Sequence, residues 1–179
     1  KRCDEAFAAV EVLKNTLLEK GMDEPIVVAG GSPTFPIHLQ REKVECSPGT
    51  FIYWDAGYQQ NLSEQKFLPA ALVISHIISL PDKTTICTDL GHKSIAAENV
   101  LSKRVFFINA QDLQLIGQSE EHLVLQAPEG HHYKVGDVLY GLPYHICPTC
   151  ALYERALIIE GGEVKNEWKI AARDRRLNV

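Results

Sequence analysis

The feature that most constrains the fold of this chain is a change in the sequence pattern near residue 48. From there to residue 170, short segments rich in β-branched and aromatic residues alternate with proline, glycine and aspartate, as in antiparallel strands joined by turns. A Gly-Gly pair in the last segment predicts a hairpin, and SIAAENV (94–100) suggests a short helix. The predicted strands are TFIYWDA (50–56), ALVISHIISL (71–80), TTICTDL (84–90), RVFFINA (104–110), HLVLQA (122–127), DVLYGL (137–142) and ALIIEGGEVKNEWKI (156–170).

The sequence before residue 48 has a different pattern. Apolar residues recur at helical spacing between residues 10 and 18, and Lys20-Gly21 is typical of a helix end. Ile26 to Ala29 then reads as a short strand buried on both faces, as in a parallel sheet. A single unit of this kind cannot close a parallel sheet. The sequence therefore predicts a mainly β protein with some α/β structure, in which a β/α remnant precedes an antiparallel β domain.

Composition narrows the function classes. The 179 residues are 45% hydrophobic, which is enough for one good core, and the net charge of −5 without a basic run argues against a nucleic-acid partner. The sequence contains no apolar run of transmembrane length and opens on an amphipathic helix rather than a secretory signal. Five cysteines, an odd number, favour reduced thiols and a cytoplasmic location.

Two segments could carry chemistry. The loop Gly30-Gly31-Ser32-Pro33-Thr34 follows the predicted buried strand, and its unhindered N–H groups and hydroxyls suit a phosphate, although an ordinary tight turn also fits. HICPTC (145–150) admits a structural zinc site, a redox pair, or an open metal site. In the last of these, His145 and Cys147 would project to one side of an extended segment. A core histidine with packed thiols is the plainest reading.

Two polar clusters beside predicted strands, DLGHK (89–93) and SEEH (119–122), are either ordinary surface residues or the rim of a site.

The order of the segments GGSPT, ECSPGTFIYWDAGYQQ, TDLGHKS, GQSEEH and GDVLYGLPYHICPT resembles the C-terminal portion of D-threonine aldolases and the related metal-dependent D-serine dehydratases. These are alanine-racemase-type, fold type III enzymes that use pyridoxal phosphate. The resemblance implies that residues 1–47 are the last β/α elements of a TIM-like barrel. It also implies that residues 48–179 are the C-terminal, barrel-like β domain.

The resemblance also implies roles for individual residues. His145 and Cys147 become ligands of a divalent metal, with Cys150 left to packing, and the thiolate favours zinc over manganese or magnesium. His122 becomes a candidate catalytic residue at the rim of the metal site. The residues expected to contact the cofactor are Gly30, Gly31, Ser32 and Thr34 at its phosphate, together with Asp55 and Tyr58.

In these enzymes the lysine that forms the Schiff base lies in an early barrel strand, and Lys83 and Lys93 lie in the wrong region to replace it. We therefore expect this chain to be a C-terminal piece of a longer, homodimeric lyase acting on D-β-hydroxy amino acids, and to be inactive alone. Retro-aldol cleavage to glycine and an aldehyde is the expected reaction. Dehydration of D-serine to a 2-oxo acid and ammonia, an amino-acid racemase, and a zinc-clipped β binding module without catalysis remain alternatives.

Overall fold

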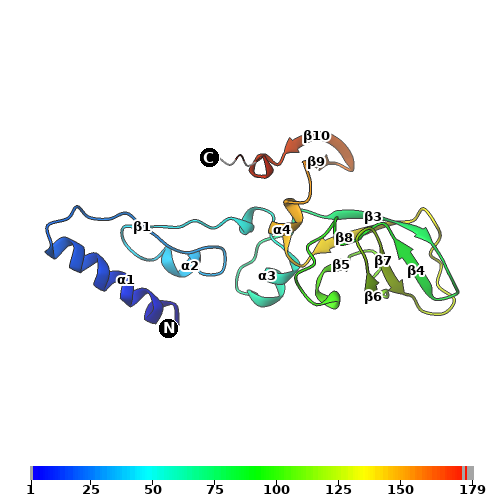
Figure 1. Ribbon diagram of the computed structural model, residues 1–179, viewed down its shortest axis with the longest axis horizontal. Helices are drawn as coiled ribbons and strands as arrows, with labels where there is room; N and C mark the ends of the chain where they lie inside the picture. Colours follow the sequence, from blue (N-terminus) through cyan, green and yellow to red (C-terminus); the bar gives the residue numbers. More distant parts are fainter. Residues whose placement is uncertain (1, 175, 177–179) are drawn as a thin grey trace. The chain divides into compact units, whose positions relative to one another are not determined.

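The computed structural model describes residues 2–174 and residue 176, so the outermost residues of both predicted domains lie outside the described part. The chain forms two compact units, Lys1–Ile52 and Tyr53–Val179 (Figure 1). The assignment of residues 1–47 to a barrel and of 48–179 to a C-terminal domain remains a prediction.

The first unit begins with helix α1 (Arg2–Glu19). The predicted helix end is confirmed, because Gly21 has a positive φ of 75° and its N–H bonds to the carbonyl of Leu18. The amide of Met22 bonds back to the carbonyl of Leu17, so the last turn satisfies carbonyls that a helix end otherwise leaves open.

The rest of the first unit is a small parallel pair of strands with two short helical turns. Strand β1 (Val27–Val28) pairs in parallel with β2 (Val44–Glu45), and between them lies helix α2 (Phe35–His38); a 3-10 turn, η1 (Thr50–Ile52), follows. The prediction that the first strand is buried on both faces is wrong for the described residues, since Ile26 is 78% and Val28 57% exposed. With one partner strand and one helix, the pair has too few neighbours to cover both faces.

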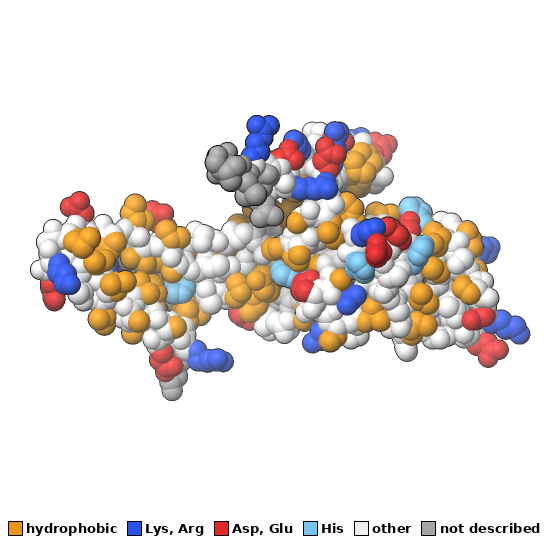
Figure 2. All heavy atoms as spheres, in the orientation of Figure 1, with side chains coloured by type: hydrophobic (Ala, Val, Ile, Leu, Met, Phe, Trp, Pro, Cys, Tyr) orange, Lys and Arg blue, Asp and Glu red, His pale blue; other side chains and the backbone are white. Residues whose placement is uncertain are grey.

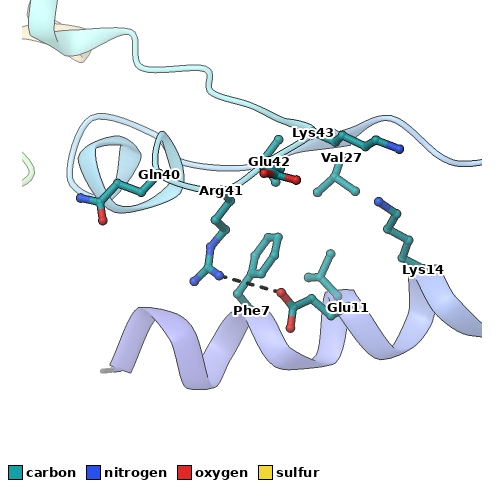
Figure 3. A pocket seen from close by; sticks show the side chains of 10 residues that line it. Phe7, Glu11, Lys14, Val27, Gln40, Arg41, Glu42 and Lys43 are labelled. Carbon is teal, nitrogen blue, oxygen red and sulfur yellow. Dashed lines mark ion pairs between the residues drawn. The ribbon is translucent and has the colours of Figure 1, made fainter.

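A cavity of about 380 Å³ lies in this unit between α1 and residues 40–44 (Figure 3). Its apolar wall comes from Phe7, Val10, Val27 and Val44. The cations around it are paired with carboxylates: Arg41 with Asp4 and Glu11, and Lys14 and Lys43 with Glu24. The hydrogen bonds from Lys14 and Lys43 lower the pKa of Glu24 to about 2.

The second unit is built on a curled, six-stranded antiparallel sheet with the order β5-β8-β3-β4-β7-β6, which confirms the predicted mainly β fold (Figure 1). Strand β3 is central because its first half pairs with β8 and its second half with β4. The strands are β3 (Val73–Ser79), β4 (Thr85–Thr88), β5 (Val105–Phe107), β6 (Gln114–Gln118), β7 (Leu123–Gln126) and β8 (Val138–Pro143).

The inner face of this sheet carries the hydrophobic core. Burial alternates along β3 and β7, as expected for strands that cover a core on one side. The completely buried side chains include Ile86, Ile95, Leu123 and Leu125. The core therefore anchors the strands from which the loops of this unit extend.

Outside the sheet lie two helices, two 3-10 turns and a hairpin. They are α3 (Ala56–Asn61), α4 (Ile146–Cys150), η2 (Leu101–Lys103), η3 (Ala171–Arg173), and the paired strands β9 (Arg155–Glu160) and β10 (Glu163–Lys169). The Gly-Gly hairpin is confirmed, with φ of 59° at Gly161 and 82° at Gly162.

Two local predictions were wrong, and one strand was not predicted. Residues 50–56 are not a strand, because η1 ends at Ile52 and Asp55 then caps α3. Residues 94–100 are not a helix but an irregular segment ahead of η2. Strand β6 was missed because QLIGQ lacks a strand pattern, and pairing with β7 makes it a strand.

Two loops of this unit approach each other so closely at Gly91 that the position requires a glycine, and this gives a direct test of the fold. A Cβ at Gly91 would overlap the carbonyl oxygen of Glu120 and the amide nitrogen of Glu121. We expect Gly91→Ala to lower the free energy of unfolding by about 1–3 kcal/mol, as overpacking does, measured by urea denaturation. Gly117→Ala is the matched control, because its Cβ would meet Val124 at an ordinary 3.8 Å, and a change within about 0.5 kcal/mol is expected. Equal losses for both variants would contradict the loop contact.

Candidate metal site

The segment that carries His145 and Cys147 is the start of a short helix. Strand β8 ends at Pro143, His145 is the N-cap of α4 with φ −133° and ψ 103°, and the helix runs from Ile146 to Cys150. The prediction that His145 and Cys147 alternate along an extended segment is therefore wrong. Pro148 does not prevent the helix because it lies in the first turn, where a missing N–H costs little.

The side chain of His145 does not cap the helix but bonds to Glu98. The distance between His145 Nδ1 and Glu98 Oε1 is 2.5 Å, and both side chains are nearly half exposed. Burial acts to raise the pKa of Glu98, but its own backbone N–H and His145 lower it below the usual value. A carboxylate favours the tautomer in which Nδ1 carries the hydrogen and donates it in a hydrogen bond. In this tautomer Nε2 keeps the lone pair that a metal needs.

Thr149 fixes the backbone of His145 from the other side. Its hydroxyl donates to the His145 carbonyl at 2.8 Å and accepts the amide N–H of Ala96 at 3.2 Å, and the side chain is only 2% exposed. The same hydroxyl therefore joins α4 to the irregular segment that carries Glu98.

The two predicted polar clusters come together in the structure. The amide of His92 bonds to the carbonyl of Ser119 at 2.9 Å, and that of Lys93 to Glu120 at 3.1 Å. Lys93 Nζ lies 2.9 Å from Glu120 and 2.7 Å from Glu121, and the hydrogen bonds that Lys93 donates to both carboxylates raise its pKa. His122 is exposed next to this pair of loops. Figure 2 shows histidine, acidic and basic side chains gathered on one face of this unit.

A hydrogen-bonded chain links this loop pair to the residues around Glu98. Arg104 donates to the Asn99 carbonyl at 3.0 Å and to Gln118 Oε1 at 2.5 Å, and Gln118 Nε2 donates to the Leu90 carbonyl at 2.9 Å. The charge of Arg104 also contributes to the lowered pKa of Glu98. Sequence reasoning missed Glu98 and Arg104, which lie in segments without a recognisable motif. It also gave no role to Gln118, although this residue belongs to the GQSEEH segment.

Asp55 and Tyr58 lie in this unit, at the start of α3. The Asp55 carboxylate is 2% exposed and accepts the amide N–H of Tyr58 and that of Ile146. The predicted contact of Asp55 and Tyr58 with a cofactor stays a prediction.

The predicted phosphate loop lies in the first unit. Gly30 has φ 93°, and a Cβ there would lie 2.8 Å from the Cα of Phe35, so the turn requires glycine. Gly31 is exposed, and a Cβ there would make only an ordinary contact of 4.0 Å with Pro33 Cδ. Ser32 is buried, and Thr34 precedes α2 without a side-chain cap. The exposure of Gly31 is compatible with the close approach of a ligand to the backbone.

Within residues 2–174 and 176, no three His, Cys, Asp or Glu side chains gather as a metal-binding group. The candidate site therefore rests on two donors, the imidazole of His145 and the exposed thiol of Cys147. Imidazole with thiolate suits zinc, and two protein ligands leave positions open for a substrate. The donor set fits a divalent ion that is shared with a second molecule rather than a closed structural site.

The motif order agrees with comparisons to known proteins. The family model described as "Putative serine dehydratase domain" matches residues 70–159, half of the chain. The chain belongs to this serine dehydratase domain family. The resemblance inferred from the sequence is thus confirmed, and α4 with His145 and Cys147 lies within the matched residues.

Relatives of this serine dehydratase domain include a 3-hydroxy-D-aspartate aldolase from Paracoccus denitrificans, 24% identical over 96% of this chain and 46% of its own. A D-threonine aldolase structure from Filomicrobium marinum superposes with a TM-score of 0.78 at 23% identity, over 89% of this chain and 44% of its own. A D-threo-3-hydroxyaspartate dehydratase structure from Delftia sp. HT23 superposes with a TM-score of 0.67 at 20% identity, over 87% of this chain and 46% of its own. The chain thus spans less than half the length of these relatives. None of the helices among the described residues is long and apolar enough to cross a membrane.

The thiol of Cys150 separates the metal and redox interpretations of CPTC. Burial, and next the neighbouring Cys147, raise the pKa of Cys150 above its usual value. A smaller thiolate fraction makes alkylation slower, so we expect Cys150 to react more slowly with iodoacetamide at pH 8 than a cysteine in an unstructured peptide. Peptide mass spectrometry over a pH series measures this rate. A Cys150 that reacts fully below neutral pH would contradict the assignment and favour a redox pair.

Proposed function

We propose that this chain supplies the metal-binding part of a pyridoxal-phosphate-dependent lyase acting on D-β-hydroxy amino acids, of the D-threonine aldolase type. One observation carries the proposal: His145, held through Nδ1 by Glu98, stands two residues before Cys147 in a member of the serine dehydratase domain family. The names of the relatives, two aldolases and a dehydratase of D-amino acids, support the same substrate class.

The residues of this chain hold and orient the reacting groups. Glu98 would keep the proton on Nδ1 of His145, so that Nε2 of His145 and the thiolate of Cys147 would hold the metal. Within the loop from Gly30 to Thr34, the backbone N–H groups of Gly30, Gly31 and Ser32 would hold the phosphate, because Pro33 has no N–H and that of Thr34 donates to the Gly31 carbonyl. When bound, pyridoxal phosphate supplies an electron sink at the α-carbon of the substrate and the divalent ion supplies a Lewis acid for the β-hydroxyl.

The same donors serve two outcomes. If the β-hydroxyl loses its proton, the bond between the α- and β-carbons breaks, and protonation of the α-carbon gives glycine beside the aldehyde. If instead the α-carbon loses its proton and the hydroxyl leaves as water, the resulting enamine tautomerises to an imine, which water hydrolyses to a 2-oxo acid and ammonia. Cys147 favours zinc over manganese, but it takes part in both reactions and therefore does not rank them. The aldolase is the first proposal and the dehydratase the second, because the relatives include two aldolases and one dehydratase.

The non-catalytic alternative, a zinc-clipped binding module, makes a different prediction for His145. The imidazole is nearly half exposed and its hydrogen bond to Glu98 is a surface contact, which contributes about 0–1 kcal/mol to stability. A structural clip would instead unfold when a ligand is removed.

The test uses the complete enzyme that contains this chain. It is assayed with D-threonine, D-serine and 3-hydroxy-D-aspartate, with and without zinc or manganese. We expect metal-dependent glycine and aldehyde formation, and we expect His145→Ala to abolish it while the circular dichroism spectrum and the urea midpoint stay nearly unchanged. His132→Ala is the control, because His132 is exposed and lies outside the site.

Three results discriminate the alternatives. Metal-dependent pyruvate from D-serine would favour the dehydratase. Unfolding of the His145→Ala protein would favour the clip. Turnover that is unaffected by metal and by His145→Ala would contradict the proposal.

A further inference from the structure

The residues on both sides of His145 are held by a segment that lies far away in the sequence, Trp54–Asn61. The amide of Gly57 donates to the carbonyl of Tyr144 at 2.9 Å, and a Cβ on Gly57 would lie only 2.6 Å from that oxygen. Asn61 Nδ2 lies 3.3 Å from the Tyr144 hydroxyl. The start of α3 is therefore packed directly against the residue that precedes His145.

Asp55 makes the contact on the other side of His145. Its Oδ1 accepts the amide N–H of Tyr58 at 2.8 Å, which caps α3, and its Oδ2 accepts the amide N–H of Ile146 at 3.0 Å. The first N–H groups of a helix have no partner within the helix, so one carboxylate satisfies a donor in each of two helices. With Asp55 2% and Ile146 4% exposed, water does not compete for this bond.

The backbone conformation ahead of Asp55 indicates that this placement is enforced. Trp54 has a positive φ of 52°, which is uncommon for a bulky residue, and its side chain is completely buried. Its ring packs 5.1 Å from the ring of Phe67 and 5.3 Å from that of Tyr58. Such a conformation persists only where the surrounding packing determines it.

Ile146 is the residue between the two proposed metal ligands. A hydrogen bond to its amide fixes the peptide that joins His145 to Ile146 and sets the direction of the first turn, in which Cys147 follows. We propose that Asp55 is a positioning residue for the metal site: it holds the His145–Cys147 turn in its binding geometry without contacting the metal. The inference rests on the proposed function, and Asp55 lies outside the residues matched by the family model.

The test measures geometry and metal affinity separately, on the 179-residue chain. Hydrogen exchange by NMR reports on the amides of Ile146 and Tyr58 without metal, and cobalt titration reports on the metal through the thiolate-to-cobalt charge-transfer band. In Asp55→Ala we expect fast exchange at both amides and a cobalt dissociation constant that rises roughly 10- to 100-fold, as for other residues that orient metal ligands. Asp55→Asn keeps one acceptor oxygen, which can serve the amide of Ile146 or that of Tyr58 but not both. We expect this variant to lose cobalt affinity if the Ile146 amide loses its protection, and to keep it if only the Tyr58 amide does.

Ile86→Ala is the matched control, because Ile86 is completely buried in the core and belongs to β4 rather than to α3 or α4. It should lower the urea midpoint of the second unit while leaving cobalt affinity and Ile146 protection unchanged. The positioning role is overturned if Ile146 stays protected in Asp55→Ala, or if Asp55→Ala and Ile86→Ala weaken cobalt binding equally. If the unsubstituted chain shows no thiolate-to-cobalt charge-transfer band, both the proposed function and the positioning role are overturned. If the band is present and Asp55→Ala leaves the cobalt dissociation constant unchanged, the positioning role alone is overturned.

Discussion

The site depends on one buried carboxylate. A charge out of contact with water is tolerated only where donors surround it, and Asp55 meets that condition with backbone N–H groups from α3 and α4. The bond to Ile146 joins segments that lie 91 residues apart in the sequence. Ile146, which donates this bond, lies between His145 and Cys147. The hydrogen bond that Asp55 needs in the interior therefore also positions His145 and Cys147.

The β-sheet supplies the rest of the support. The central strand β3 and its neighbours hold the core. Strand β4 leads into the segment that carries Glu98, β6 into residues 119–122, and β8 into α4. Thr149, Glu98 and Arg104 then connect α4 to those loops through hydrogen bonds to side chains and backbone. The proposed metal ligands are accessible, as a site shared with a substrate requires: the thiol of Cys147 is exposed and the His145 side chain is nearly half exposed. Asp55 and Thr149, which hold the backbone around them, are buried.

Local patterns in the sequence predicted most strands, since alternating burial along β3 and the Gly-Gly turn at 161–162 follow from adjacent residues. The family also followed from the sequence, because the order of several motifs is more specific than any one of them. Helix α4 could not be predicted, because a five-residue helix containing proline gains its N-terminal partner from Asp55. Glu98 was likewise hidden, since it bonds to a histidine 47 residues away. Contacts of this separation depend on the packed sheet.

The most direct test of the account is anomalous diffraction from crystals of the zinc-loaded chain, with data collected on both sides of the zinc edge. The account predicts a zinc peak within bonding distance of His145 Nε2 and Cys147 Sγ, with Glu98 on Nδ1 and Asp55 still bonded to the amide of Ile146. A zinc ion bound by Cys147 and Cys150 together, or located away from His145, would contradict it.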